Sequence, residues 1–452
     1  MNKNFLRFFL FLLFLTLSTQ AQSKDIFSAD GFLNVSAGLA NQASAFEAKK
    51  LPDGINRNYS KEKFAIGNDS QIFLRAQKKL ENGINYGAVA KVEFNFNSNH
   101  RKENPNLDQT FLFAESDFGK VEFGNNFAVN QKMKVGAARI ARGAGGINGK
   151  YLEHINLSMP KNSLGNVRLP AFILLAQSPI GHGGGAKNFS EKFNRSNFRA
   201  LKDTSFDGVE DATKLSYYSP RLEGLQLGVS YAPNAANSGF TANTALDSTT
   251  TRIENIFSLG ANYMLDLDNL GLAFSATAEK GNVKNSKSPA GTPLNDLMAY
   301  DLGASASYFG FTLGFSYGSW LKSLQPKSGI YSCDYEPARP LGSQDCRDYS
   351  GKKYANPNYF TAGISYEFGP AAASITALQS NFQNNKYQAI SLGLDYKLSR
   401  DFMPYFEVTK FAFSSNQPTA SDLVNQGSLP ASQRQLKDNL GYVFLTGILL
   451  SF

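Results

Sequence analysis

Residues 84–96, INYGAVAKVEFNF, alternate apolar and polar side chains along their whole length. One face carries Ile84, Tyr86, Ala88, Ala90, Val92, Phe94 and Phe96. The other carries Asn85, Gly87, Lys91, Glu93 and Asn95, with only Val89 as an apolar exception. A period of two residues predicts an extended strand with one apolar and one polar face. Because a half-buried strand of a soluble protein shows the same period, repetition along the chain must decide the fold.

The pattern recurs in sixteen segments. Five lie before a long gap: 31–40, 70–79, 84–96, 107–116 and 120–125. Eleven follow it: 212–219, 224–232, 253–264, 270–280, 297–308, 310–320, 357–368, 371–380, 386–398, 402–414 and 438–452. An even number of antiparallel strands closes into a single-chain barrel with both ends on one side of a membrane. The sequence therefore predicts an all-β transmembrane antiparallel barrel of sixteen strands.

The two ends of the chain agree with export to an outer membrane. Lys3 and Arg7 precede an apolar run from Phe8 to Leu17, and small residues follow up to Ala21. This pattern predicts a cleaved signal peptide over 1–21 and a barrel domain over 22–452, because the run is too short for a spanning helix. At the other end, residues 439–452 form a strand with a continuous apolar face that ends at Phe452. This strand should pair with the first one, residues 31–40, to close the barrel.

Composition is consistent with a barrel. Beyond the signal peptide no apolar stretch reaches spanning-helix length, and mean hydropathy is -0.29, yet aromatic residues make up 13% of the chain. A barrel strand alternates lipid-facing and lumen-facing residues, so it never forms a hydrophobic block.

Connection lengths carry a second regularity. Tight turns are predicted at 80–83, 116–119, 220–223, 266–269, 309–310, 369–370 and 399–401, each supplying turn-forming residues. They alternate with longer polar connections at 41–69, 97–106, 126–211, 233–252, 281–296, 321–356 and 415–437, and with a short one at 381–385. Short turns on one rim and long loops on the other are typical of periplasmic and extracellular ends.

Two segments resemble the general (non-specific) porins of Gram-negative bacteria. Residues 108–125, DQTFLFAESDFGKVEFGN, resemble the hairpin before the third loop of porins, and 214–231, KLSYYSPRLEGLQLGVSY, resemble the hairpin after it. The resemblance implies a homotrimer of water-filled barrels in outer-membrane lipid and lipopolysaccharide, passing small hydrophilic solutes. It also implies that the third loop, here 126–211, folds into the lumen, and that Phe452 is read by the barrel assembly machinery.

Charge in the third loop suggests a selectivity. The loop has twelve Lys and Arg against six Asp and Glu, a net charge of +6. The whole chain is +8, and removing Lys3 and Arg7 leaves +6, so the loop accounts for the entire excess. Cations lining a constriction favour anions, which predicts mild anion preference. Candidate constriction residues are Arg75, Lys91, Lys120, Glu93, Glu115 and Glu122 on the wall, and Lys132, Lys134, Arg139, Arg142 and Glu153 on the loop.

Other readings stay open. Many of these charges could sit in water or face lipopolysaccharide phosphates. A structural or adhesive barrel with a plugged pore would share the pattern, as would a substrate-specific channel. Sugar-selective barrels typically show an aromatic ladder, whereas Phe and Tyr here fall mainly on lipid-facing positions.

Enzymatic, metal and nucleic-acid functions find little support. HGGG at 182–185 and GFSYG at 314–318 imitate parts of a hydrolase, but His100, His154 and His182 all precede Ser316, and 311–320 alternates straight through as a strand. No Cys/His cluster has metal-ligand spacing, no phosphate-binding loop is present, and no cofactor is expected. Export and the dispersal of Lys and Arg outside the third loop argue against nucleic acid. Cys333 and Cys346 share one predicted extracellular loop, which favours a disulfide.

Overall fold

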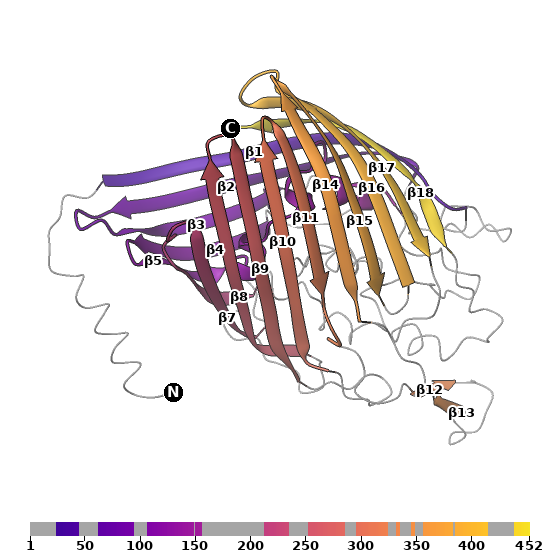
Figure 1. Cartoon of the computed structure of the whole chain (residues 1–452), viewed down its shortest axis with the longest axis horizontal. Helices are drawn as coiled ribbons and strands as arrows, with labels where there is room; N and C mark the ends of the chain where they lie inside the picture. Colours follow the sequence, from indigo (N-terminus) through magenta and orange to yellow (C-terminus); the bar gives the residue numbers. More distant parts are fainter. Residues whose placement is uncertain are drawn as a thin grey trace.

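Sixteen antiparallel strands close into a barrel (Figure 1). The computed structural model describes residues 24–44, 62–94, 106–148, 150–155, 212–234, 252–284, 295–323, 331–334, 345–348, 356–382, 385–414 and 438–452. The predicted signal peptide, residues 1–21, lies outside these ranges. Residues 156–211, the larger part of the third loop, also lie outside them.

The first half of the wall consists of β1 (Lys24–Asn41), β2 (Phe64–Lys79), β3 (Asn85–Phe94), β4 (Asn106–Ser116), β5 (Gly119–Asn125), β6 (Thr213–Tyr218), β7 (Leu225–Asn234) and β8 (Arg252–Leu267). The second half consists of β9 (Leu270–Lys284), β10 (Leu297–Tyr308), β11 (Phe311–Ser319), β14 (Asn358–Phe368), β15 (Ala371–Phe382), β16 (Asn385–Tyr396), β17 (Phe402–Ser414) and β18 (Asn439–Ser451). Each predicted segment corresponds to one of these strands, so the prediction of a sixteen-stranded barrel is confirmed.

The barrel closes where its two ends meet. β1 pairs with β18 from Phe32 opposite Ser451 to Asn41 opposite Tyr442. Beyond the ladder, Gly31 N–H donates to the Phe452 carbonyl at 2.9 Å, and Phe452 N–H donates back to the Gly31 carbonyl at 3.0 Å. The chain end therefore lies beside β1, as Figure 1 shows. Closure satisfies backbone groups that lipid could not hydrogen-bond.

Several strands are longer than predicted, and β1 begins at Lys24 where residue 31 was expected. β2 begins at Phe64, although Gly67, Asn68 and Asp69 were expected in the long connection 41–69. These three residues instead pair with β1, where the ladder satisfies their backbone groups. The predicted loop 321–356 also contains an additional two-stranded sheet of β12 (Tyr331–Asp334) and β13 (Asp345–Asp348).

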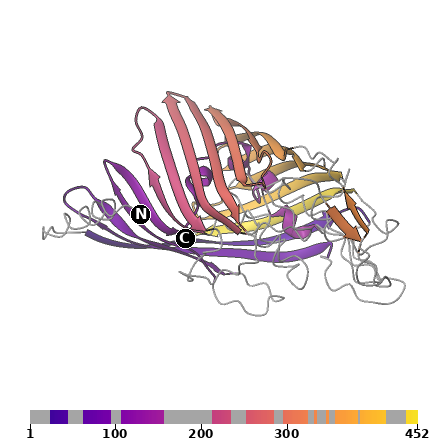
Figure 2. The same cartoon turned by 90° about the horizontal axis from the view of Figure 1, so that it is seen from below.

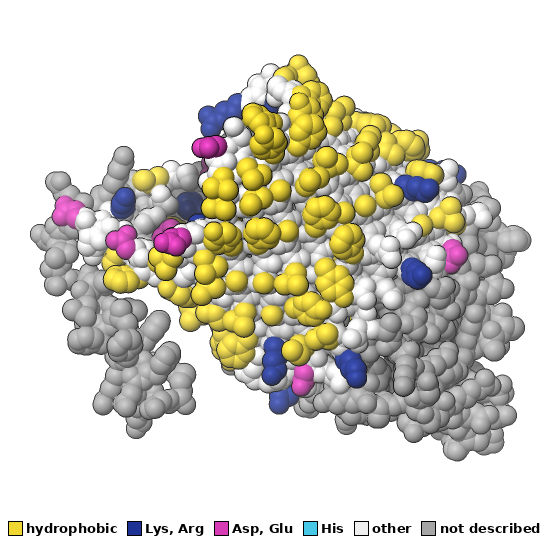
Figure 3. Space-filling model, in the orientation of Figure 1, with side chains coloured by type: hydrophobic (Ala, Val, Ile, Leu, Met, Phe, Trp, Pro, Cys, Tyr) yellow, Lys and Arg dark blue, Asp and Glu magenta, His cyan; other side chains and the backbone are white. Residues whose placement is uncertain are grey.

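The outer face of the wall is apolar. Exposed large hydrophobic residues alternate along the strands, among them Leu259 and Leu302 at 55% and 52% exposed. On the face shown in Figure 3, hydrophobic side chains cover the wall strands, and charged side chains gather near its edges. No helix among the described residues is both long and apolar enough to span a bilayer.

A hydrophobic core lies on the inner side of the wall. Ile147, Tyr151 and Ile155 of the third loop belong to one buried cluster with wall residues, and these include Tyr387, Phe411, Phe413, Val443 and Leu445. The hydroxyl groups of Tyr151 and Tyr387 are hydrogen-bonded at 2.6 Å. Part of the lumen is therefore filled by packing between the loop and the wall strands β16 to β18.

Candidate functional site

The described part of the third loop, residues 126–155 without Gly149, follows the inner wall. It contains α2 (Val129–Lys132), η1 (Ala137–Arg139), η2 (Gly146–Asn148) and α3 (Tyr151–His154). In chain order, α2 packs against β6 to β9, η1 against β11, β14 and β15, η2 against β15 to β17, and α3 against β18 and β1. Figure 2 shows these short helices enclosed between the strands. The expectation that the loop folds into the lumen is confirmed for this part.

Glycines on the inner wall let the loop backbone come close. An added Cβ at Gly260 would lie 2.7 Å from Met133 Sδ, and one at Gly314 would lie 3.0 Å from the Ala137 nitrogen. Such approaches leave no room for a side chain. Wall glycines that meet the loop in this way include Gly38 of β1 and, farther round the wall, Gly228, Gly260, Gly303, Gly314, Gly363 and Gly393. They line a seat for the loop at β1 and from β7 to β16.

Wall carboxylates hold the loop backbone in this seat. Glu407, which is fully buried, accepts hydrogen bonds from the N–H groups of Ala144 and Gly146, both at 2.8 Å. Asp395 accepts one from Gly143 N–H at 2.7 Å. Hydrogen bonds to a charged acceptor are roughly twice as strong as neutral ones. The glycine-rich stretch 143–146 is therefore fixed by β16 and β17.

Basic side chains of the loop mostly meet carboxylates of the wall. Lys132 pairs with Glu122 at 2.5 Å, Lys134 with Asp301 at 3.9 Å, and Lys150 with Asp69 at 2.7 Å. Arg142 pairs with both Glu367 and Asp395. The Glu153 side chain is exposed on α3. Most cations in this part of the loop therefore act as anchors, and their charge is largely compensated.

Lys134 is the most deeply buried of these anchors. Burial lowers the pKa of its ammonium group from 10.5 to about 8, while the nearby carboxylates of Asp301 and Glu279 partly oppose this shift. Its Nζ also lies 3.4 Å from the Tyr359 hydroxyl oxygen. The ion pair is thus held in a desolvated contact between loop and wall.

Of the three candidate arginines, two have no carboxylate partner among the described residues. Arg75 lies exposed on β2, with its Cζ 5.4 Å from the centre of the Phe113 ring. Arg139 is exposed on η1 and donates only to the carbonyls of Gln131 and Lys132. By contrast, Lys91 pairs with Glu93 at 3.1 Å. Arg75 and Arg139 are therefore the candidate cations that no described carboxylate pairs with, whereas Lys120 and Lys132 share the single carboxylate of Glu122.

Several aromatic rings face inward, which the sequence pattern understated. Phe73 lies opposite Lys91 in the ladder, so the two share a face, and the Lys91 Nζ is 5.9 Å from the ring centre. The Lys132 Nζ lies 5.1 Å from the centre of Phe111 and 5.7 Å from that of Tyr218. The ring of Phe111 was missed because β4 reads apolar on both faces.

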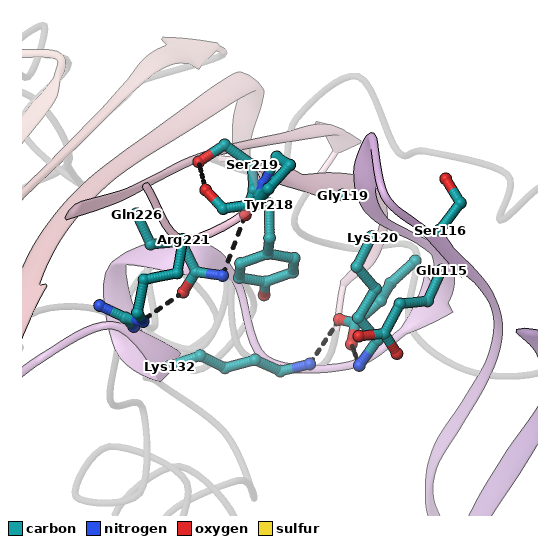
Figure 4. A pocket seen from close by; sticks show the side chains of 11 residues that line it. Glu115, Ser116, Gly119, Lys120, Lys132, Tyr218, Ser219, Arg221 and Gln226 are labelled. Atoms are coloured by element: carbon teal, nitrogen blue, oxygen red, sulfur yellow. Dashed lines mark hydrogen bonds and ion pairs between the residues drawn. The ribbon is translucent and has the colours of Figure 1, made fainter. Parts of the chain in front are cut away.

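A cavity of about 450 Å³ lies where the β4–β5 and β6–β7 turns meet α2. Figure 4 shows the Tyr218 ring between Arg221 and Lys120 in this cavity. Lys120 and Lys132 both pair with Glu122, at 2.8 and 2.5 Å, and Glu115 lines the same space. Arg221 was missed by the sequence analysis because it stands in a turn rather than on an alternating strand.

The two cysteines occupy opposite positions in the backbone register of the small sheet. Cys333 of β12 is the Cα partner of Cys346 of β13. Directly opposed residues of antiparallel strands have Cα atoms about 4.5–5.5 Å apart, within the usual range for a disulfide.

Comparisons with known proteins agree with this geometry. A family model described as Gram-negative porin matches residues 10–416. An uncharacterised protein of Rickettsia bellii is 25% identical over 421 residues, covering 84% of this chain and 85% of the relative. Another from Rickettsia conorii is 24% identical over 368 residues, covering 71% of each chain.

The fold has a counterpart among solved structures. An anion-selective porin from Comamonas acidovorans aligns with a TM-score of 0.51 and 14% identity, covering 95% of this chain and 100% of that one. At this identity the likeness shows the fold alone. Together with the match over most of its length, the closed barrel and its inward third loop show that the chain belongs to the Gram-negative porin family.

Proposed function

We propose that the barrel is a water-filled channel for passive diffusion of small hydrophilic solutes and ions across the outer membrane. The observation that carries this proposal is the path of the third loop, whose described part follows the inner wall from β6 to β1. A loop held along the wall narrows a sixteen-stranded barrel, which is wide enough for an aqueous lumen. Export with cleavage after Ala21, assembly as a homotrimer in lipid and lipopolysaccharide, and recognition of Phe452 by the assembly machinery belong to the same proposal.

The channel should prefer anions mildly. The reason is the position of individual cations rather than the net charge of the whole loop. Four of its five described cations pair with wall carboxylates, and of these Lys132 shares its partner Glu122 with Lys120. The preference then rests on Arg75 and Arg139, which the described carboxylates do not compensate. A full charge about 5 Å from the ion path changes the energy of a monovalent ion by about 0.8 kcal/mol in water, before screening. The effect has opposite signs for chloride and potassium.

Reversal potentials in a KCl gradient across a planar bilayer test the channel and its selectivity together. The wild-type channel should pass chloride more readily than potassium. Arg75→Gln and Arg139→Gln should each lower the chloride-to-potassium permeability ratio severalfold. Lys410→Gln is the matched control, because Lys410 lies over Tyr442 on the outer face of β17. Cation selectivity of the wild type would overturn the anion preference, and no conductance at all would favour a structural barrel with a plugged pore.

A substrate-specific channel is the second candidate, favoured by the inward rings of Phe73 and Phe111. Rings on a lumen face offer apolar contact that a purely polar pore lacks. A general channel should pass neutral sugars at rates that fall smoothly with size in liposome swelling. One solute permeating faster than its size allows would favour the specific channel.

A further inference from the structure

We infer that the cavity between the β4–β5 and β6–β7 turns binds a small polyhydroxylated monocarboxylate, of the aldonate or uronate class. This inference rests on the proposed channel function and names a solute class for it. The cavity lies beside the inner face of β5 and β6, at the rim with the short turns. Its volume of about 450 Å³ suits a solute of sugar size.

Charge in the cavity favours one negative group. The carboxylate of Glu122, only 2% exposed, is shared by Lys120, Lys132 and the Asn126 amide. One carboxylate therefore compensates only one of two ammonium groups. Both lysine side chains stay about 30% exposed, at 32% and 28%, and so keep N–H donors for a further acceptor.

Arg221 adds a second uncompensated cation. Its guanidinium donates to neutral oxygens, the Gly224 carbonyl at 2.5 Å, Gln226 Oε1 at 3.3 Å and Asn262 Oδ1 at 2.9 Å. These bonds fix the group at the cavity without neutralising it. Lys132 is likewise held between Glu122 and the rings of Phe111 and Tyr218. The donors are thus positioned before any ligand arrives, which lowers the cost of binding.

The Glu115 carboxylate favours a singly charged anion over a doubly charged one in this cavity. The lining holds Lys120, Lys132 and Arg221 against Glu115 and Glu122, so its net charge is +1. A dianion such as hydrogen phosphate would place a second negative charge near the exposed Glu115 carboxylate, which opposes it. A hydroxyl group can instead donate to that carboxylate, and Ser116, Ser219 and Gln226 offer further polar contacts. A polyol with a single carboxylate meets both requirements.

Single-channel recording with glucuronate, glucose and phosphate tests this site. Glucuronate should interrupt the KCl current with at least tenfold higher apparent affinity than glucose or phosphate, about 1.4 kcal/mol. Arg221→Gln and Lys120→Gln should each lower the glucuronate affinity about tenfold, since each removes a charged donor. Glu115→Gln should raise the affinity for phosphate relative to glucuronate. Arg400→Gln, in the turn before β17 on the same rim, is the matched control and should leave every affinity unchanged.

The outcomes separate this inference from the proposed function. A conducting channel that treats glucuronate and glucose alike overturns the inference and leaves the channel standing. The inference is also overturned, and the channel still stands, if Arg221→Gln and Lys120→Gln bind glucuronate as tightly as the control Arg400→Gln. If the purified protein does not conduct, the proposed function fails. Titration calorimetry of the detergent-solubilised protein with the same solutes and variants then decides whether the cavity binds glucuronate.

Discussion

Replacing Gly303 by alanine tests whether the third loop is seated directly on the inner wall. The new Cβ would lie closer than 2.5 Å to the Val135 carbonyl oxygen and 2.8 Å from Ser275 Oγ, whereas real Cβ atoms essentially never approach within 3.0 Å. The loop must therefore move away from β10 by more than about half an ångström. The hydrogen bond from Val135 N–H to Ser275 Oγ, now 2.9 Å long, would lengthen with it.

Overpacking costs about 1–3 kcal/mol and the weakened hydrogen bond about 1 kcal/mol more, so the free energy of unfolding should fall by about 2–4 kcal/mol. Gly67→Ala is the matched control, because nothing lies within 4 Å of its added Cβ. Alanine in a strand is otherwise favoured over glycine by about 0.5–1 kcal/mol, so this variant should be slightly more stable than the wild type.

The assay combines urea unfolding in detergent with single-channel conductance. Gly303→Ala should unfold at lower urea and conduct less, since its loop is pushed into the lumen. Gly67→Ala should do neither. If the two variants match in both stability and conductance, the loop does not rest on Gly303 and the proposed seat is wrong.

Three further results are expected. Because Lys134 has a pKa of about 8 in the barrel and 10.5 ordinarily, the unfolded chain binds more protons between these values, and stability should rise there by up to about 3 kcal/mol. Thermal unfolding at pH 7 and 9.5 should show about 2 kcal/mol of this rise in the wild type and none in Lys134→Met. Cys333 and Cys346 should form a disulfide, so mass spectrometry should show two thiols available to alkylation only after reduction. Deleting Phe452 should lower the yield of assembled trimer more than the conductance of each channel, and an undiminished yield would argue against its role in assembly.

The alternating pattern predicted the wall well because each strand has only two faces. Residues 84–96 show this, since the predicted lumen face of Val89 and Lys91 is the buried one in the structure. The pattern predicted strand ends less well where pairing with a distant strand extends a strand beyond its alternating residues. Residues 67–69 were assigned to the long connection 41–69, yet they pair with β1, a partner that local sequence does not reveal.

The candidate site was identified by residue but not by role. Sequence placed Arg142 and Lys134 on the loop, but their partners Glu367 and Asp301 lie more than a hundred residues away. The net charge of the loop could not show which cations are compensated. Arg75 and Arg139 differ from the other candidate cations in having no carboxylate partner among the described residues.

The sequence by itself determined the sixteen strands, their inner and outer faces and the basic character of the third loop, because side-chain alternation and composition are local properties. Only the closed barrel decided which wall carboxylates the loop would meet, where glycines would leave room for it, and that Arg221 would share a cavity with Lys120. Those outcomes depend on the register and closure of distant strands, which no local pattern contains. Electrostatic potential in the lumen follows the distances between charges, and these exist only once the barrel has closed.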